Sequence, residues 1–377
     1  DTENHRIQKF DGQGNFITTW GSEGNDVGHF NNPFGITVDP EGNVYVADTL
    51  NYRIQKFDSN GNFITTWGTE GSEAGQFQCP EGIALDSEGN IYVADTENHR
   101  IQKFDKKGNF ITKWGLNGTG DGMFNNPFGI AVNFSGDIYL ADTENQRIQI
   151  FTPLIETKKE EIIPEVISPV LEEERVTEKE ELPSVPSAEL PVTLMPHETF
   201  IFIKKWGTRG DRDTQFDNPY GVSIDLSENI YVADTFNHSI KKYDSNGNFI
   251  TLWGSNGTED GQFNNPFRVT IDNTGNVYVA DTLNNRIQKF SSEGAFIMKW
   301  GIKGSKEGEF NNPFGIALDN SGNIYVADTF NHAIQKFSSE GKFITRWVSG
   351  ERENFHFRFP RGLAIDNSGY LYVVDWE

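Results

Sequence analysis

Cysteine, methionine and long apolar runs are scarce in this sequence of 377 residues. Cys79 is the single cysteine, which excludes an internal disulfide framework. No apolar run approaches the 18 or more residues that suggest a membrane-spanning helix, and no signal-peptide pattern is present. The chain begins at Asp1 instead of Met, so we expect a processed or excised piece of a longer protein.

Positive charge is also scarce. The chain has 32 Lys and Arg against 55 Asp and Glu, which gives a formal net charge of −23. Nucleic acids and acidic membrane surfaces require a concentrated basic surface, so this balance excludes both as expected partners. A protein partner, or other copies of the same chain, remains the expected class.

A repeat of 47 residues dominates the sequence. The segment DTENHRIQKFD occurs at 1–11 and again at 95–105. One Asp of each repeat belongs to a D-T or V-D-W step, and six of the seven intervals between these Asp residues are 47 residues long. The series comprises Asp1, Asp48, Asp95, Asp142, Asp234, Asp281, Asp328 and Asp375. Such a period indicates a solenoid or a propeller.

Each repeat contains four short runs with the alternation of β-strands. In the first complete repeat they lie at 35–39, 43–48, 53–58 and 62–67, and we name them strands a, b, c and d. Turn sequences such as DPEGN and DSNGN separate a from b and c from d, and their Gly supplies the positive φ of a tight hairpin. Four-stranded antiparallel units of this length predict the blades of an all-β propeller.

The two ends of the chain are complementary. Six complete blades are predicted at 34–67, 81–114, 128–206, 220–253, 267–300 and 314–347. The C-terminal part supplies only strands a and b, and the N-terminal part only c and d, so their pairing predicts a seventh blade without an open edge. The alternative is a longer array in which half-blades of neighbouring molecules complete each other.

An insertion interrupts the third blade. Propeller sequence occupies 1–151 and 200–377, and residues 152–199 replace the c–d turn of this blade. The insertion has no Gly and no aromatic residue, but it holds 7 of the 15 Pro and a net charge of −8. This composition predicts either a solvated tether or an arm that packs on the propeller or on another copy.

The repeat resembles the NHL repeat, as in NNPFGIALDNSGNIYVADTFNHAIQKF at 311–337. The resemblance covers the chain outside the insertion and implies a β-propeller. It implies little about function, because one fold serves many functions.

Departures from the repeat are the best candidates for a site. After the Pro that begins strand a, five blades place Phe or Tyr, but two place Glu81 and Arg361. Arg268 replaces a Gly at the next position. These residues are expected near the axis, on the face formed by the b–c and d–a links, where they could hold a small anionic or zwitterionic ligand. Drift among redundant repeats is the alternative.

The other conspicuous polar residues are interpreted as structural. The Asp after strand b is expected to accept backbone N–H bonds in the b–c turn and to face an Arg five residues later, which Ser239 and Ala333 replace in two blades. The seven structural Asp residues are Asp48, Asp95, Asp142, Asp234, Asp281, Asp328 and Asp375. Four His residues share a position that other blades fill with Tyr, Gln or Asn, which we interpret as a surface slot, not a metal site; they are His5, His99, His238 and His332.

The sequence therefore predicts a non-enzymatic scaffold that binds protein or self-assembles, with the insertion as an interaction arm and with no cofactor, metal or catalytic residue. Four N-x-S/T sequons weakly favour an extracellular or cell-surface location; they are Asn117, Asn133, Asn237 and Asn256. The alternative is a propeller enzyme of the lyase or lactonase type with a ligand or metal near the axis. RNA binding, known for some NHL proteins, conflicts with the acidity.

Overall fold

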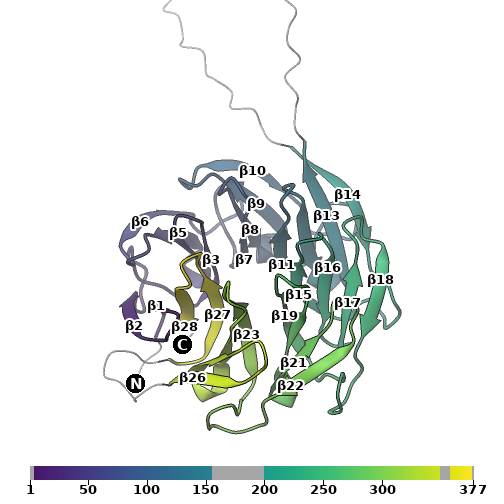
Figure 1. The fold of residues 1–377 in the computed structure, drawn as a ribbon. Helices are drawn as coiled ribbons and strands as arrows, with labels where there is room; N and C mark the ends of the chain where they lie inside the picture. The colour runs from purple at the N-terminus through teal and green to yellow at the C-terminus, as the bar shows by residue number, and fades with distance from the viewer. Residues whose placement is uncertain (1–3, 155–198, 349–356, 376–377) are drawn as a thin grey trace, which may run out of the picture.

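Seven four-stranded antiparallel sheets form a closed ring around a central axis (Figure 1). The computed structural model describes residues 4–154, 199–348 and 357–375. The prediction of an all-β, seven-bladed propeller is confirmed. Within the described part of the chain, no helix is long and apolar enough to cross a membrane.

Blades 1 to 3 follow one another along the chain, each running from the axis outward as strands a to d. Blade 1 consists of β3 (Pro33–Val38), β4 (Val44–Asp48), β5 (Arg53–Phe57) and β6 (Phe63–Trp67). Blade 2 consists of β7 (Pro80–Leu85), β8 (Ile91–Asp95), β9 (Arg100–Phe104) and β10 (Phe110–Trp114). Blade 3 consists of β11 (Pro127–Val132), β12 (Ile138–Asp142), β13 (Arg147–Pro153) and β14 (Phe200–Trp206).

Blades 4 to 6 repeat the pattern after the insertion. Blade 4 consists of β15 (Pro219–Ile224), β16 (Ile230–Asp234), β17 (Ser239–Tyr243) and β18 (Phe249–Trp253). Blade 5 consists of β19 (Pro266–Ile271), β20 (Val277–Asp281), β21 (Arg286–Phe290) and β22 (Phe296–Trp300). Blade 6 consists of β23 (Pro313–Leu318), β24 (Ile324–Asp328), β25 (Ala333–Phe337) and β26 (Phe343–Val348).

Blade 7 joins the two ends of the chain, and its sheet order is β2-β1-β28-β27. The C-terminal part contributes β27 (Pro360–Ile365) and β28 (Leu371–Asp375), and the N-terminal part contributes β1 (Arg6–Phe10) and β2 (Phe16–Trp20). Five residues of β1 pair with β28, from Arg6 opposite Asp375 to Phe10 opposite Leu371. The predicted closure within one molecule is confirmed.

The core lies between blades. Each b strand is buried along its whole length, because it is covered on both faces by neighbouring blades. Between blades 1 and 2, Tyr45 and Trp67 pack against Phe104. The Trp also lies on the c–d turn of the next blade, where a Cβ on Gly108 would come within 2.4 Å of the Trp67 ring. The turn therefore needs Gly both for its positive φ and for this contact.

In blade 3 the insertion takes the place of the short c–d turn. Strands β13 and β14 are each seven residues long, so β13 extends two residues into the predicted insertion, and the Leu154 N–H donates to the Thr199 carbonyl at 2.8 Å. Phe200 stacks on Trp114 with ring centroids 4.3 Å apart, which covers the indole where other blades use Gly. The predicted tether or packed arm lies outside the described residues.

The short links have defined conformations. In the c–d turn of blade 1, Asp58 accepts bonds from the backbone N–H groups of Asn60 and Asn62 at 2.8 and 2.9 Å. Five b–c links form a 3-10 turn that ends in a residue with left-handed backbone. These turns are η1 (Thr49–Asn51), η2 (Thr96–Asn98), η3 (Thr143–Asn145), η4 (Thr282–Asn284) and η5 (Thr329–Asn331).

Candidate functional site

The repeated Asp after strand b is a buried hub that joins three segments of its blade. In blade 1, Asp48 accepts bonds from the Asn31 backbone N–H at 2.7 Å and from Arg53 Nε at 2.7 Å. Gln55 Nε2 donates to the same carboxylate at 3.0 Å. The predicted Arg partner is present, but the predicted backbone donor is wrong: it comes from the preceding d–a link instead of the b–c turn. One carboxylate thus holds the link, strand b and strand c together.

Blades 4 and 6 lack the Arg, but each has another cation near its Asp. In blade 4, Lys241 takes the place of the usual Gln and lies 2.8 Å from the Asp234 carboxylate. In blade 6, burial raises the pKa of Asp328 to about 6, and the positive charge of Arg346 on strand d opposes this shift. The replacement cation thus lies two residues further along strand c in blade 4 and on strand d in blade 6.

The interpretation of the His position as a surface slot is also wrong. These residues end the b–c link with positive φ, and their side chains accept the backbone N–H of the next blade's d–a link. A His, Gln or Asn can supply this acceptor, and Asn and His tolerate the left-handed backbone better than most residues. The bonds join Asn32 to His5, Asn126 to His99, Asn218 to Gln146, Asn265 to His238, Asn312 to Asn285, and Phe359 to His332.

This clamp predicts acid sensitivity at His238. Its Nδ1 accepts the Asn265 N–H at 3.1 Å and must stay unprotonated to do so. Burial lowers the pKa of His238 below its ordinary value, against the nearby Asp281 and Asp234. A lowered folded-state pKa gives stability that is present above the unfolded pKa and is lost as the pH falls through the folded one.

We therefore expect the variant His238→Asn, which copies Asn285 of blade 5, to reduce the loss of unfolding free energy between pH 8 and pH 5 by about 1 kcal/mol. Urea unfolding of both proteins at the two pH values measures this. Equal pH dependence of the two proteins would contradict the clamp.

An aromatic collar narrows the axis on the b–c and d–a face. It is built from the Phe or Tyr that follows the Pro of strand a. The ring centroids of Phe34 and Phe128 are 5.2 Å apart, those of Phe128 and Tyr220 4.1 Å, and those of Phe267 and Phe314 5.2 Å. Phe34 and Phe128 belong to blades 1 and 3, and they meet because Glu81 of blade 2 contributes no ring. The collar opens into a cavity of about 190 Å³.

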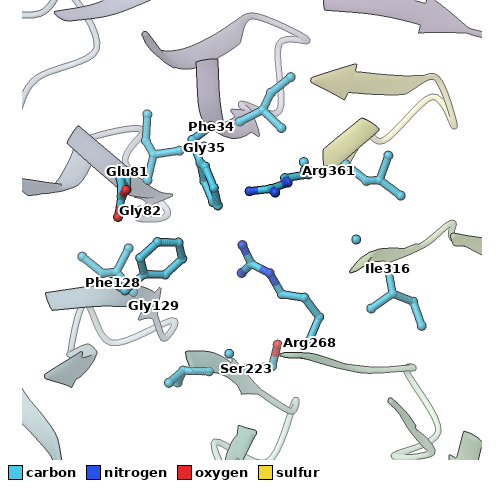
Figure 2. Close-up of a pocket in the computed structure, with 18 of the residues that line it drawn as sticks. Phe34, Gly35, Glu81, Gly82, Phe128, Gly129, Ser223, Arg268, Ile316 and Arg361 are labelled. Atoms are coloured by element: carbon cyan, nitrogen blue, oxygen red, sulfur yellow. The ribbon is translucent and has the colours of Figure 1, made fainter. Parts of the chain in front are cut away.

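Arg268 and Arg361 meet in this cavity. Figure 2 shows both side chains directed toward its centre, from β19 and β27 respectively. The Arg268 guanidinium carbon lies 5.8 Å from the Tyr220 ring and 5.9 Å from Phe314, and that of Arg361 lies 5.5 Å from Phe314. Burial lowers the pKa of Arg268, and the nearby Tyr220 opposes this shift. Two cationic side chains, of which Arg268 is desolvated, therefore line one small space.

Glu81 lines the same cavity but does not lie with the arginines. In Figure 2 the rings of Phe34 and Phe128 lie between it and the two guanidinium groups. Burial raises the pKa of Glu81 to about 7, a bond with Thr96 opposes this shift, and the charge of Glu97 adds to it. The sequence placed the three residues together; the structure brings two of them face to face and directs the third elsewhere.

A set of apolar side chains that the sequence reasoning missed lies on the same face. The residue after the Thr of the b–c link is Phe236, Leu283 and Phe330 in blades 4, 5 and 6, and these side chains are 50%, 43% and 48% exposed. Phe359 of the next d–a link packs edge-on against Phe330, with centroids 5.2 Å apart. We call these four residues the apolar arc. The signal was available, because blades 2 and 3 place Glu97 and Glu144 at the same repeat position.

Phe359 adopts a backbone conformation that is unfavourable for a bulky aromatic residue. Its φ is +56°, a left-handed conformation that five other blades assign to Asn. A bulky aromatic residue is rarely found there, and the strain costs of order 1 kcal/mol. Within the described residues, no group of three or more His, Cys, Asp or Glu side chains lies close enough to hold a metal ion.

Comparison with known proteins agrees with this architecture. The NHL repeat model matches residues 30–57, 77–104, 124–151, 263–290 and 310–337. This propeller contains five NHL repeats. Each match runs from the end of a d–a link through strand c, and blade 4, with its Lys241 hub, falls outside the matches. A search of curated proteins finds no match to the chain.

Several solved structures share the NHL propeller's fold at low sequence identity. A streptogramin B lyase is 14% identical, with 99% of each chain covered and a TM-score of 0.61. A virginiamycin B lyase from Staphylococcus aureus is 12% identical, with 97% of this chain and 98% of that chain covered and a TM-score of 0.61. Kuenenia stuttgartiensis hydrazine synthase is 12% identical, with 92% and 93% covered and a TM-score of 0.62. At these identities the likeness concerns the fold alone.

Proposed function

We propose that the propeller is a non-enzymatic scaffold that binds a protein partner on the face formed by its b–c and d–a links. The observation that carries this proposal is the apolar arc. It places four large apolar side chains on three consecutive blades and the following link; at the b–c position blades 2 and 3 have Glu97 and Glu144, and blade 1 has Leu50, which is 41% exposed. Apolar groups gathered on one face of a soluble domain mark an interaction surface.

The surroundings of the arc define the chemistry of the partner. The six fully described d–a links, at 21–32, 68–79, 115–126, 207–218, 254–265 and 301–312, contain 12 Asp and Glu against 4 Lys and Arg. An apolar centre with an acidic border fits a segment that presents apolar side chains flanked by Lys or Arg. A second copy would oppose acid to acid, so a different protein is favoured over self-assembly.

We further place the protein outside the cell or at its surface. Of the four sequons, Asn117 and Asn256 are exposed on d–a links, where a glycan would have room. The other two are engaged in structure: Asn133 is buried, and Asn237 donates to the Asp234 carboxylate at 2.9 Å.

A displayed peptide library selected on the purified protein tests the proposal. We expect selected peptides to combine apolar residues with Lys or Arg, and to bind Phe330→Glu at least tenfold more weakly. Glu97 and Glu144 show that Glu fits this repeat position, so the variant should fold. The control is Leu226→Glu, which changes an exposed residue at an a–b turn on the opposite face. Equal loss in both variants, or no loss in Phe330→Glu, would contradict the proposal.

A second candidate is catalysis in the axial cavity, which one observation favours. Glu81 has a pKa of about 7 in a partly closed space, and a carboxyl group of this kind suits general acid–base work near neutral pH. Turnover of a lactone or ester panel that disappears in Glu81→Gln would support an enzyme. Activity unchanged in that variant would exclude Glu81 from it.

A further inference from the structure

The cavity at the axis holds a cation without a counter-charge. Arg268 makes no hydrogen bond or ion pair within the described residues, and its contacts are the faces of Tyr220 and Phe314. A guanidinium group has five N–H donors, and removing it from water is costly unless they find acceptors. Cation–π contacts offset only part of this cost.

Arg361 brings a second positive charge to the same cavity. Its guanidinium group enters the same cavity from the other side and shares the Phe314 ring with Arg268 (Figure 2). Like charges that face each other in a space of low polarity repel strongly. Glu81 lies beyond the rings of Phe34 and Phe128, so it does not occupy the space between the two guanidinium groups. An anion placed there would contact both.

The close approach of neighbouring blades leaves little room for a side chain at the repeat position of Arg268. The equivalent residue is Gly in the other six blades, because the carbonyl of the next blade approaches closely: a Cβ on Gly35 would lie 2.2 Å from the Glu81 oxygen, and one on Gly315 would lie 2.0 Å from the Arg361 oxygen. In blade 5 Arg268 pairs with Ala280, whereas the equivalent Gly35 of blade 1 has no pair, and the flanking pairs keep the same register in both blades. A residue that breaks a steric rule of its own fold marks a functional position.

The residues that line the cavity indicate which kind of anion would bind there. Guanidinium groups bind planar carboxylates through two parallel N–H donors, and aromatic faces accept the apolar part of an organic ligand. The protein is strongly acidic and Glu81 lies nearby, so a single negative charge meets less repulsion than a double one.

We propose that the axial cavity is a binding site for a small monocarboxylate, held by Arg268 and Arg361 with its apolar part against the collar. The site is separate from the apolar arc, so either proposal can fail without the other.

Benzoate serves as the probe, and isothermal titration of the intact chain at pH 8 measures its binding. We expect one site with a dissociation constant on the order of 1 mM, the range of so small a ligand. The variants Arg268→Gly and Arg361→Phe restore the residues of the other blades, so they should fold, and each should weaken binding at least tenfold. The control Arg209→Gln removes one charge from a d–a link side chain that is 80% exposed, and it should leave binding within twofold.

Three outcomes would overturn the proposal: no saturable binding of benzoate, equal weakening in the control, or tighter binding of inorganic phosphate than of benzoate. The thermal midpoint of each variant, measured alongside, separates loss of binding from loss of fold. Arg268→Gly is expected to unfold at the same or a higher temperature than the natural chain, because it removes a crowded, desolvated cation.

Discussion

Removal of residues 1–20 is expected to abolish the stable propeller. The truncation deletes β1 and β2, exposes the edge of β28 and removes the fully buried side chains of Ile7 and Phe10. Burial of two such side chains contributes about 3–6 kcal/mol, which is comparable with the whole net stability of a typical domain. The freed edge of β28 would also offer unpaired backbone groups to other molecules. Static light scattering and urea unfolding should show aggregates and loss of the cooperative transition.

A circular permutant is the matched control for this truncation. It contains residues 21–377 followed by 1–20, so that blade 7 becomes continuous in the chain. The Asn4 side chain donates to the Asp375 carboxylate at 2.8 Å, which shows that the new connection spans a short distance. We expect the permutant to remain monomeric and to unfold at a urea concentration equal to or above that of the natural chain. A truncated protein as stable as the permutant would contradict closure by the chain ends.

The second large effect is expected from Asp95→Ala. The Asp95 carboxylate is fully buried and accepts bonds from the Gln78 N–H, Asn98 and Arg100, the last at 2.6 Å. The substitution removes the carboxylate counter-charge of the buried Arg100 guanidinium group, which costs about 3–5 kcal/mol. Chemical unfolding should show this as a lower midpoint with an unchanged slope.

Blade 4 provides the comparison for Asp95→Ala. The double variant Ser239→Arg with Lys241→Gln rebuilds the hub of the other blades around Asp234, whose present partner is Lys241 at 2.8 Å. Exchange of one paired cation for another should change the unfolding free energy by no more than about 1 kcal/mol. A loss below about 1 kcal/mol in Asp95→Ala, or a loss above about 3 kcal/mol in the double variant, would refute the hub as a main source of stability.

The fold was predictable because the same pattern of strands and turns recurs in every repeat. Strand boundaries in blade 1 agree with the prediction to within two residues, and the seventh blade follows from which strands each end supplies. The hub was predictable only in part. Spacing identified Arg53 as the partner of Asp48, but the donor from Asn31 lies 17 residues earlier in sequence, and no local pattern signals it.

The candidate site was likewise predictable only in part. Departures from the repeat located Arg268, Arg361 and Glu81, because position in the blade fixes distance from the axis. They could not show that Phe34 and Phe128 would close over the gap left by Glu81, since that contact joins blades 1 and 3. The His clamp was missed because its role depends on the N–H of another blade. The repeat spacing predicts where a residue lies in its blade, but the direction of its side chain and its contacts with other blades decide its role.

The central claim is that the b–c and d–a face binds the partner, and amide hydrogen exchange on the complex with a selected peptide tests it most directly. The backbone N–H groups of Phe236, Leu283 and Phe330 donate to carbonyls of the d–a links at 3.0 to 3.1 Å, so they report the opening of this face. We predict slower exchange at these three amides on binding, and unchanged exchange at the a–b turns of the same blades. Protection confined to the a–b and c–d turns would contradict the account.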